Sequence, residues 1–158
     1  EAELAAARRM AEKVGVELTF ERRSADTTAA VDSRRIRRIL RNLITNAIEH
    51  GEAKPIDVYV GGDPRALAIT VRDHGLGFRP EDGALVFGRF WRADPARSRV
   101  VGGTGLGLAS AQEDVHRQRG RISACCLLGW GGQLRVLLPR KHGEDVDLGP
   151  SHDVEVAG

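Results

Sequence analysis

The chain has 158 residues, of which 41% are hydrophobic and 29% charged, a composition typical of a globular domain rather than a disordered segment. Its 24 basic and 22 acidic residues nearly cancel to a net charge of +2, which argues against nucleic-acid or membrane-surface binding driven by bulk charge. No apolar run approaches a membrane span, and the two adjacent cysteines lack metal-binding spacing and fit a reducing, cytoplasmic setting.

The first part of the chain predicts a helix followed by a strand. Residues 1–14 are rich in Ala, Glu and Arg and read as the end of a helix that breaks at Gly15. Apolar and polar residues alternate over 16–21, which predicts a strand, and residues 29–31 predict a short second strand. Because the chain starts without Met inside a helix, we expect it to be a piece of a longer protein.

A longer helix follows. Asp32 or Ser33 can cap its start, and it should run to about His50 and stop at Gly51. Its apolar residues recur at helical spacing and predict a face that packs on a sheet. They are Ile36, Ile39, Leu40, Leu43, Ile44 and Ala47.

The middle of the chain predicts a pair of strands and then a loop. Residues 56–60 and 67–71 read as strands joined by a Gly-Gly-Asp-Pro turn at 61–64. Residues 80–99 read as loop-rich with a short helix.

The last part of the chain predicts a helix and a hairpin. The helix covers 105–119 and ends at Gly120, and the hairpin strands cover 122–128 and 134–138. Residues 141–158 are polar and read as a flexible tail. The expected fold is therefore α+β, a two-layer α/β sandwich in which a mixed, mostly antiparallel sheet packs against helices.

Two asparagines on the longer helix are candidate ligands. Asn42 and Asn46 are four residues apart, so their side chains project from one edge, beside the apolar stripe. An amide oxygen suits Mg²⁺, which prefers oxygen ligands and usually keeps several waters. The alternative is an ordinary surface amide. With the motifs below, Asn46 is the predicted ligand, whereas Asn42 remains open between the two interpretations.

An acidic residue follows the second strand of the central pair. Asp73 precedes Gly75 and Gly77, and a carboxylate at a strand end can accept a hydrogen bond from the exocyclic amine of adenine. The glycines allow the backbone to approach the base. The alternative is an ordinary Asp-x-Gly turn.

A glycine-rich loop runs straight into the next helix. It comprises Gly103, Thr104, Gly105, Leu106 and Gly107. Unpaired N–H groups at a helix N-terminus form an anion site, which indicates a phosphate cradle. No Lys-Ser or Lys-Thr follows, so it is no Walker loop, and its spacing is a poor dinucleotide fingerprint.

An aromatic cluster at residues 87–91 precedes the charged segment 92–102, which lacks apolar periodicity. This pattern predicts a mobile lid over the phosphates. Arg89 or Arg92 would contact the terminal phosphate. The alternative is an aromatic core contribution followed by a solvated loop.

Together these motifs resemble the N, G1, F and G2 boxes of bacterial sensor histidine kinases. The matching segments are 42–47 (NLITNA), 73–77 (DHGLG), 87–90 (FGRF) and 103–109 (GTGLGLA). Residues 14–140 resemble the catalytic, ATP-binding domain of these kinases, a Bergerat fold of the superfamily that includes gyrase B, Hsp90 and MutL. Residues 86–95, together with GGTGLGLA, resemble the MtrB-type kinases of actinobacteria.

The resemblance implies a role for each motif. Asn46 would bind Mg²⁺, Asp73 would anchor adenine, and Gly75 and Gly77 would shape the base pocket. The loop at 103–107 would hold the phosphates of ATP.

Two neighbouring positions of the long helix carry further implications. His50 falls where the family often has Tyr or His near the base and sugar. Glu49 falls where a phosphate-binding Lys is common, which places that contact in doubt and leaves it to a lid arginine.

Position 42 separates kinases from hydrolases in this superfamily. Asn42 stands where the gyrase-like ATPases carry a Glu that activates water, and an amide cannot act as that base. Slow hydrolysis is therefore expected, which suits transfer to histidine. The predicted catalytic residues are Asn42, Arg89 and Arg92, acting by positioning and charge neutralisation.

The resemblance also implies partners. The phosphate-accepting histidine of the family lies on a separate dimerisation domain in a His-acid-Leu motif, which no histidine of this chain matches. Helix 1–13 resembles the remnant of the linker from that domain, so this chain should bind ATP without phosphorylating itself. A response regulator would receive the phosphoryl group, and the parent protein would be dimeric and anchored in the membrane, with this domain in the cytoplasm.

Two other functions remain open. A serine kinase of the anti-sigma-factor type shares the fold, but it needs a glutamate base that Asn42 does not supply. A nucleotide-sensing module without catalysis would keep the same binding residues.

Overall fold

The computed structural model describes residues 2–77, 85–88, 107–127, 129–141 and 144. Its elements in chain order are α1 (Ala2–Lys13), β1 (Leu18–Arg22), α2 (Ser33–His50), β2 (Ile56–Gly62), β3 (Ala66–Arg72), the 3₁₀ turn η2 (Leu85–Phe87), α4 (Gly107–Arg117), β4 (Arg121–Leu127) and β5 (Gly131–Pro139).

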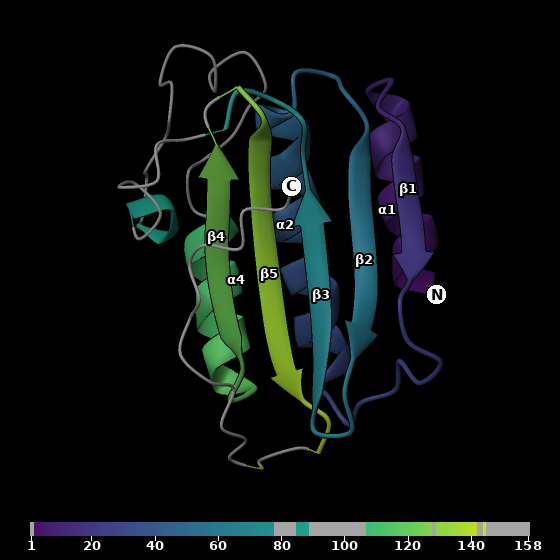
Figure 1. The fold of residues 1–158 in the computed structure, drawn as a ribbon, viewed down its shortest axis with the longest axis vertical. Coiled ribbons are helices and arrows are strands. Elements are labelled where there is room, and N and C mark those ends of the chain that lie inside the picture. Colours follow the sequence, from purple (N-terminus) through teal and green to yellow (C-terminus); the bar gives the residue numbers. More distant parts are fainter. Residues whose placement is uncertain (1, 78–84, 89–106, 128, 142–143, 145–158) are drawn as a thin grey trace.

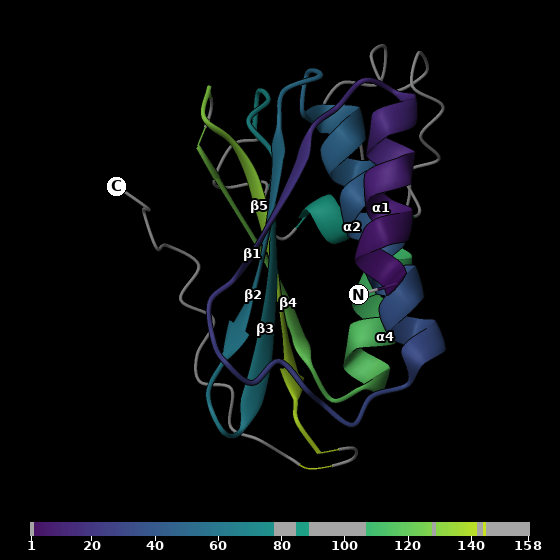
Figure 2. The same ribbon diagram turned by 90° about the vertical axis from the view of Figure 1, so that its right-hand side faces the viewer.

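In the described part of the chain, the strands form one five-stranded sheet in the order β1-β2-β3-β5-β4. β1 and β2 run parallel, and the other neighbouring strands run antiparallel. Figure 1 looks onto one face of the sheet, and Figure 2 shows α1, α2 and α4 together on the other face. The predicted α+β sandwich with a mixed, mostly antiparallel sheet is therefore confirmed.

The core lies between the sheet and the helices. The apolar stripe of α2 is buried as predicted, and Ile39, Leu43 and Ile44 have no exposed surface. Alternate residues of the strands, such as Val58 and Val136, are buried against this layer. Each large aliphatic side chain buried in this way contributes about 1.5–3 kcal/mol to folding.

The ends of α2 follow the sequence signals. The Asp32 side chain accepts a hydrogen bond from the backbone N–H of Arg34 at 2.9 Å and a longer one from that of Arg35 at 3.4 Å, so Asp32 caps the helix. At the other end, a Cβ on Gly51 would stand 2.4 Å from the carbonyl oxygen of Ala47. Both predicted ends of this helix are confirmed.

The prediction of a short strand at residues 29–31 is wrong. This segment has no regular structure and makes one backbone hydrogen bond, from Ala30 N to Arg140 O at 2.7 Å. The Arg140 guanidinium holds the preceding loop instead, because it donates to the carbonyl oxygens of Thr28 and Asp26 at 2.7 and 2.9 Å. One backbone hydrogen bond to a neighbouring segment is too few to pair two strands.

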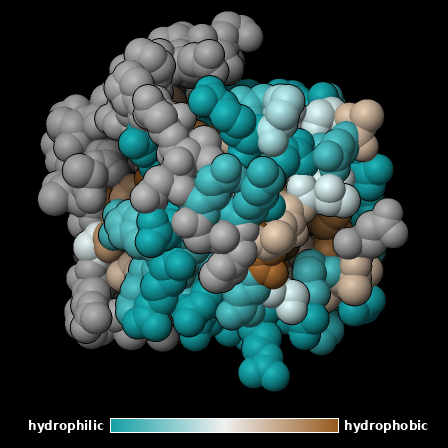
Figure 3. Space-filling model, turned by 90° about the horizontal axis from the view of Figure 1, so that it is seen from below, coloured by the Kyte–Doolittle hydropathy of each residue, from teal (hydrophilic) through white to brown (hydrophobic). Residues whose placement is uncertain are grey.

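The turn between β2 and β3 is tighter than predicted. Gly61 and Gly62 still pair with β3, so the turn begins at Asp63. The Asp63 carboxylate accepts hydrogen bonds from the backbone N–H groups of Arg65 and Ala66, both at 2.8 Å. Figure 3 views the molecule from this end, where the described surface is largely hydrophilic with small hydrophobic patches.

The remaining predicted elements fit the described residues. The helix predicted over 105–119 is present as α4, although residues 105 and 106 lie outside the described part, and the hairpin is present as β4 and β5. The predicted tail lies almost wholly outside the described residues, as does most of the predicted loop at 80–99. Within the part of the chain that the structure describes, no helix is long and apolar enough to cross a membrane.

Candidate nucleotide site

Asp73 follows β3 directly and is buried, with 7% of its surface exposed. Its Oδ1 atom accepts hydrogen bonds from the backbone N–H groups of Gly75 at 3.0 Å and Gly132 at 3.1 Å. One carboxylate oxygen therefore joins the loop after β3 to the start of β5, and the other oxygen, Oδ2, is not used by either bond.

Burial raises the pKa of Asp73 above its ordinary value, because the charged form loses solvent. The hydrogen bonds from Gly75 and Gly132 oppose this rise in pKa, and so do the nearby imidazoles of His50 and His74. The carboxylate is thus buried and held in place by two backbone N–H donors. Such a fixed acceptor can bind a single polar group of a ligand.

Glycine is required where the loop after β3 meets the end of α2. An ideal Cβ on Gly75 would stand 1.8 Å from the carbonyl oxygen of His50, so no side chain fits there. Gly77 has a φ of 70°, a conformation that favours glycine. These contacts bring Asp73 next to the C-terminal turn of α2.

His74 faces away from this site. Its Nε2 atom lies 2.7 Å from Oδ2 of Asp57, and Asp57 also accepts a hydrogen bond from the Thr19 hydroxyl at 2.6 Å. Burial would raise the pKa of Asp57, but the bonds from Thr19 and His74 outweigh it and the pKa lies below its ordinary value. The His74–Asp57 contact therefore also joins the loop after β3 to the face of β2 that points away from the helices.

The two asparagines of α2 are half-buried and lie four residues apart on one edge of the helix. A Cβ on Gly107, the first residue of α4, would stand 3.7 Å from Oδ1 of Asn42. The start of α4 therefore lies against the middle of α2. Amide oxygens of this kind, with waters and phosphate oxygens, match the ligand set that Mg²⁺ uses.

No group of three or more His, Cys, Asp or Glu that would hold a metal occurs among the described residues.

The predicted site residues that the structure describes lie on α2, at the start of α4 and in the loop after β3. Asn42, Asn46 and His50 occupy successive turns of α2, and the loop after β3 lies at the end of that helix. Several predicted residues lie outside the described part of the chain: Arg89, Arg92, Gly103, Thr104, Gly105 and Leu106.

The sequence reasoning missed two residues of β5. Gly132 donates to Asp73, and Gly131, with a φ of 97°, approaches so closely that a Cβ would stand 2.1 Å from the Asp73 carbonyl oxygen. In the sequence, this glycine pair indicates only a hairpin turn. Its contact with Asp73 depends on β3 and β5 being neighbours in the sheet.

The fold is a two-layer α+β sandwich in which a buried carboxylate lies beside an asparagine-bearing helix. The chain belongs to the family described as "Histidine kinase-, DNA gyrase B-, and HSP90-like ATPase", whose model matches residues 31–143. This membership places it among ATP-binding domains and confirms the family resemblance.

Curated relatives are sensor histidine kinases. The chain is 48% identical to MtrB of Mycolicibacterium paratuberculosis and 47% identical to MtrB of Mycobacterium tuberculosis, in each case over 89% of this chain and 25% of the relative. It is 37% identical to WalK of Bacillus subtilis over 77% of this chain and 20% of that protein. The chain thus spans about a quarter or less of the length of these relatives.

Solved structures share the fold. The catalytic domain of histidine kinase ThkA matches with a TM-score of 0.74 at 22% identity, covering 89% of both chains. The mycobacterial sensor histidine kinase MprB matches with a TM-score of 0.71 at 24% identity, covering 89% of this chain and 91% of that one.

Proposed function

We propose that this chain is the ATP-binding catalytic domain of a two-component sensor histidine kinase. It would transfer the γ-phosphate of ATP to a histidine on the dimerisation domain of the same kinase. Two findings together carry the proposal. The chain is 48% identical to an MtrB kinase, and Asp73 is buried beside the helix that carries the asparagines.

Asp73 is the residue we assign to the base of the nucleotide. Because its Oδ1 atom already accepts from Gly75 and Gly132, Oδ2 is the acceptor for the exocyclic amine of adenine. A hydrogen bond to a charged group is worth about 1.5–3 kcal/mol. Guanine carries a carbonyl oxygen at this position of its ring, so the same carboxylate would repel it.

Asn46 is the residue we assign to Mg²⁺, which neutralises charge on the phosphates when it is bound. Asn42 lies against the start of α4 and carries an amide, which cannot remove a proton from water. The domain would therefore act by orienting ATP toward its acceptor while leaving water unactivated. His50 would lie near the base and sugar.

Residues beyond the described part complete the proposal. Gly103, Thr104, Gly105 and Leu106 would hold the phosphates ahead of Gly107, and Arg89 and Arg92 would stabilise charge on the transferred group. The acceptor would be supplied by the dimerisation domain of a membrane-anchored, dimeric parent protein. A response regulator would then receive the phosphoryl group in the cytoplasm.

The first experiment is a calorimetric titration of the 158-residue chain with Mg-ATP, and with Mg-GTP as the control. A purified dimerisation domain of the same kinase and radiolabelled ATP are then added. Mg-dependent, adenine-selective binding followed by label on the histidine would support the proposal. Binding without transfer would favour a nucleotide sensor, and absence of binding would contradict the site assignment.

A further inference from the structure

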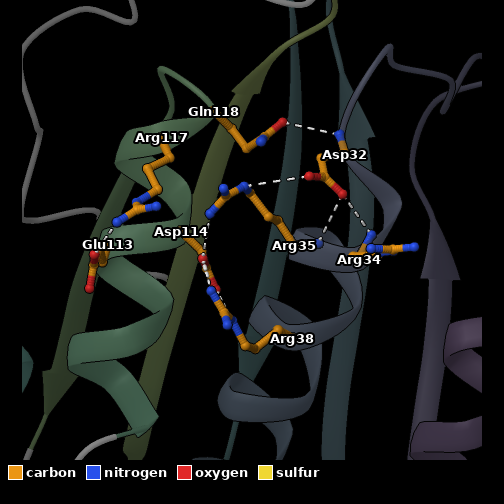
Figure 4. Close-up of polar contacts among 8 residues, drawn as sticks. All are labelled: Asp32, Arg34, Arg35, Arg38, Glu113, Asp114, Arg117 and Gln118. Carbon is orange, nitrogen blue, oxygen red and sulfur yellow. Dashed lines mark hydrogen bonds and ion pairs between the residues drawn. The ribbon is translucent and has the colours of Figure 1, made fainter.

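A second buried carboxylate lies away from the nucleotide site. Asp114 is on α4, and its side chain is 1% exposed. The Arg38 guanidinium donates to both of its carboxylate oxygens, and Arg35 Nη1 donates to Oδ1 at 3.2 Å (Figure 4). Both arginines come from the N-terminal half of α2, so one carboxylate joins the two helices.

Two guanidinium groups surround the single carboxylate of Asp114. Hydrogen bonds from Arg38 are the main reason why the pKa of Asp114 lies below its ordinary value, so the buried group is a carboxylate at neutral pH. A planar guanidinium that grips both oxygens of a carboxylate fixes their relative position as well as their distance.

A second contact joins the ends of the same two helices. Just after α4, the Gln118 side chain accepts a hydrogen bond from the backbone N–H of Asp32 at 3.2 Å. Asp32 is the N-cap of α2, and its carboxylate lies 3.5 Å from Nε of Arg35. Figure 4 shows this contact beside the Asp114 pair.

These contacts form a series along two antiparallel helices. Asp32 meets Gln118, Arg38 meets Asp114, and Asn42 meets Gly107. At 1.5 Å per residue, the Arg38 pair lies about 6 Å along α2 from Asn42. A shift of the helices at the ion pair would therefore move the asparagines against the first turn of α4.

The hydrophobic effect is non-directional, and the paired guanidinium and carboxylate add a directed contact to the packing of the two helices. Asp114 is 1% exposed, whereas the Arg38 side chain is 52% exposed, so only the carboxylate is buried. An ion pair of this kind is weak evidence for stability, and its bidentate geometry fixes the relative position of the two helices. The α2–α4 contact includes Asn42 and Gly107, the first residue of α4.

We propose that Asp114, Arg38 and Arg35 are positioning residues that fix the axial register of α2 against α4, and so place Asn42 and Asn46 against the start of α4. The proposal rests on the function proposed above. We call these three residues the register brace. The brace serves the Mg²⁺-dependent part of ATP binding, and the proposed adenine anchor Asp73, which follows β3, is independent of it.

The test compares Asp114→Asn with Glu113→Gln. Both changes remove one negative charge from α4, but Glu113 makes an exposed pair with Arg117 at 2.7 Å and lies outside the brace. We expect Asp114→Asn to weaken Mg-ATP binding about tenfold, equivalent to about 1.4 kcal/mol, while ATP affinity in EDTA stays within about twofold. Glu113→Gln should change neither affinity.

A second pair of variants keeps the test decisive if Asp114→Asn fails to fold. Arg38→Gln removes the exposed partner, with Arg34→Gln as the control one turn earlier. Arg38→Gln should give the same selective loss, and Arg38→Gln combined with Asp114→Asn should be no worse than either alone. Thermal unfolding of each variant identifies losses that come from instability.

The outcomes separate the two proposals. If the wild-type protein and the folded variants bind Mg-ATP equally well, the register brace is overturned and the proposed function stands. Equal losses for Mg-ATP and for ATP in EDTA would also overturn it, because they would indicate a general structural role. Absence of Mg-dependent binding by the wild-type protein would overturn the proposed function and the brace with it.

Discussion

Gly75 lies against the carbonyl group of His50 so closely that an ideal Cβ would stand 1.8 Å from the oxygen. This contact joins the loop after β3 to the end of α2. It is also what brings the Asp73 carboxylate beside the helix that carries Asn42 and Asn46. Gly75 therefore allows the loop to pack against α2, in addition to allowing the backbone to approach a ligand.

Gly75→Ala should separate the loop from α2 and weaken ATP binding by at least about tenfold, with a loss of stability of about 1–3 kcal/mol from the forced overlap. The control is Gly15→Ala. Gly15 has a φ of 74° but no atom within 4 Å of an added Cβ, so that change brings backbone strain without overlap. Calorimetry and urea unfolding check both variants. Unchanged ATP affinity in Gly75→Ala would contradict the assignment.

Asp73→Asn should fold, because an amide oxygen can still accept from the N–H groups of Gly75 and Gly132. The amide nitrogen then replaces Oδ2 and meets the exocyclic amine of adenine donor to donor. We expect ATP affinity to fall about 10- to 150-fold, from the loss of about 1.5–3 kcal/mol. Discrimination against Mg-GTP should fall in parallel, and calorimetry with both nucleotides measures it.

The pH dependence of the site follows from the raised pKa of Asp73. Folding raises this pKa, so the contribution of Asp73 to stability is fully present below its unfolded pKa and is lost as pH rises through the folded pKa. ATP affinity should change in the opposite direction, because a protonated carboxyl is a poorer acceptor.

The ratio of wild-type to Asp73→Asn affinity isolates this residue from other titrating groups. It should approach one as pH falls from neutral into the acidic range. A ratio that stays constant would show that Asp73 does not accept a bond from the base.

Asn46→Ala should abolish the Mg²⁺ dependence of ATP binding and leave binding in EDTA intact, because it removes an oxygen ligand without altering the base site. The control is Arg41→Ala, an exposed position on the same helix. Calorimetry with and without EDTA checks the result. Equal Mg²⁺ dependence in wild type and Asn46→Ala would contradict the assignment of Asn46 as the metal ligand.

Arg140→Ala should destabilise the domain by about 2 kcal/mol without changing the site directly. Its guanidinium donates to the carbonyl oxygens of Asp63, Thr28 and Asp26 at 2.6, 2.7 and 2.9 Å. It therefore holds the loop before α2 to the turn before β3. Urea unfolding measures the loss, and Arg65→Ala, at an exposed position in the same turn, should stay within about 0.5 kcal/mol of wild type.

The sequence by itself determined the local elements and the positions of the described candidate residues within them. The cap at Asp32, the apolar stripe of α2 and the stop at Gly51 depend on residues close in the chain, so spacing predicts them. The asparagines on one helix edge and the Asp73 loop were predictable for the same reason. The prediction at residues 29–31 failed because a short apolar run does not reveal whether a partner strand lies beside it.

Only the tertiary structure decided which distant groups meet. Gly132 reaches Asp73 because β5 lies next to β3, and strand order is not written in the local pattern of either strand. In the sequence, Asp114 has no feature that distinguishes it from other polar residues on a helix. In the fold it is buried and pairs with Arg38 and Arg35 of α2. A buried charge needs hydrogen-bonded partners, and for Asp114 these partners come from another helix, so the arrangement exists only in the folded chain.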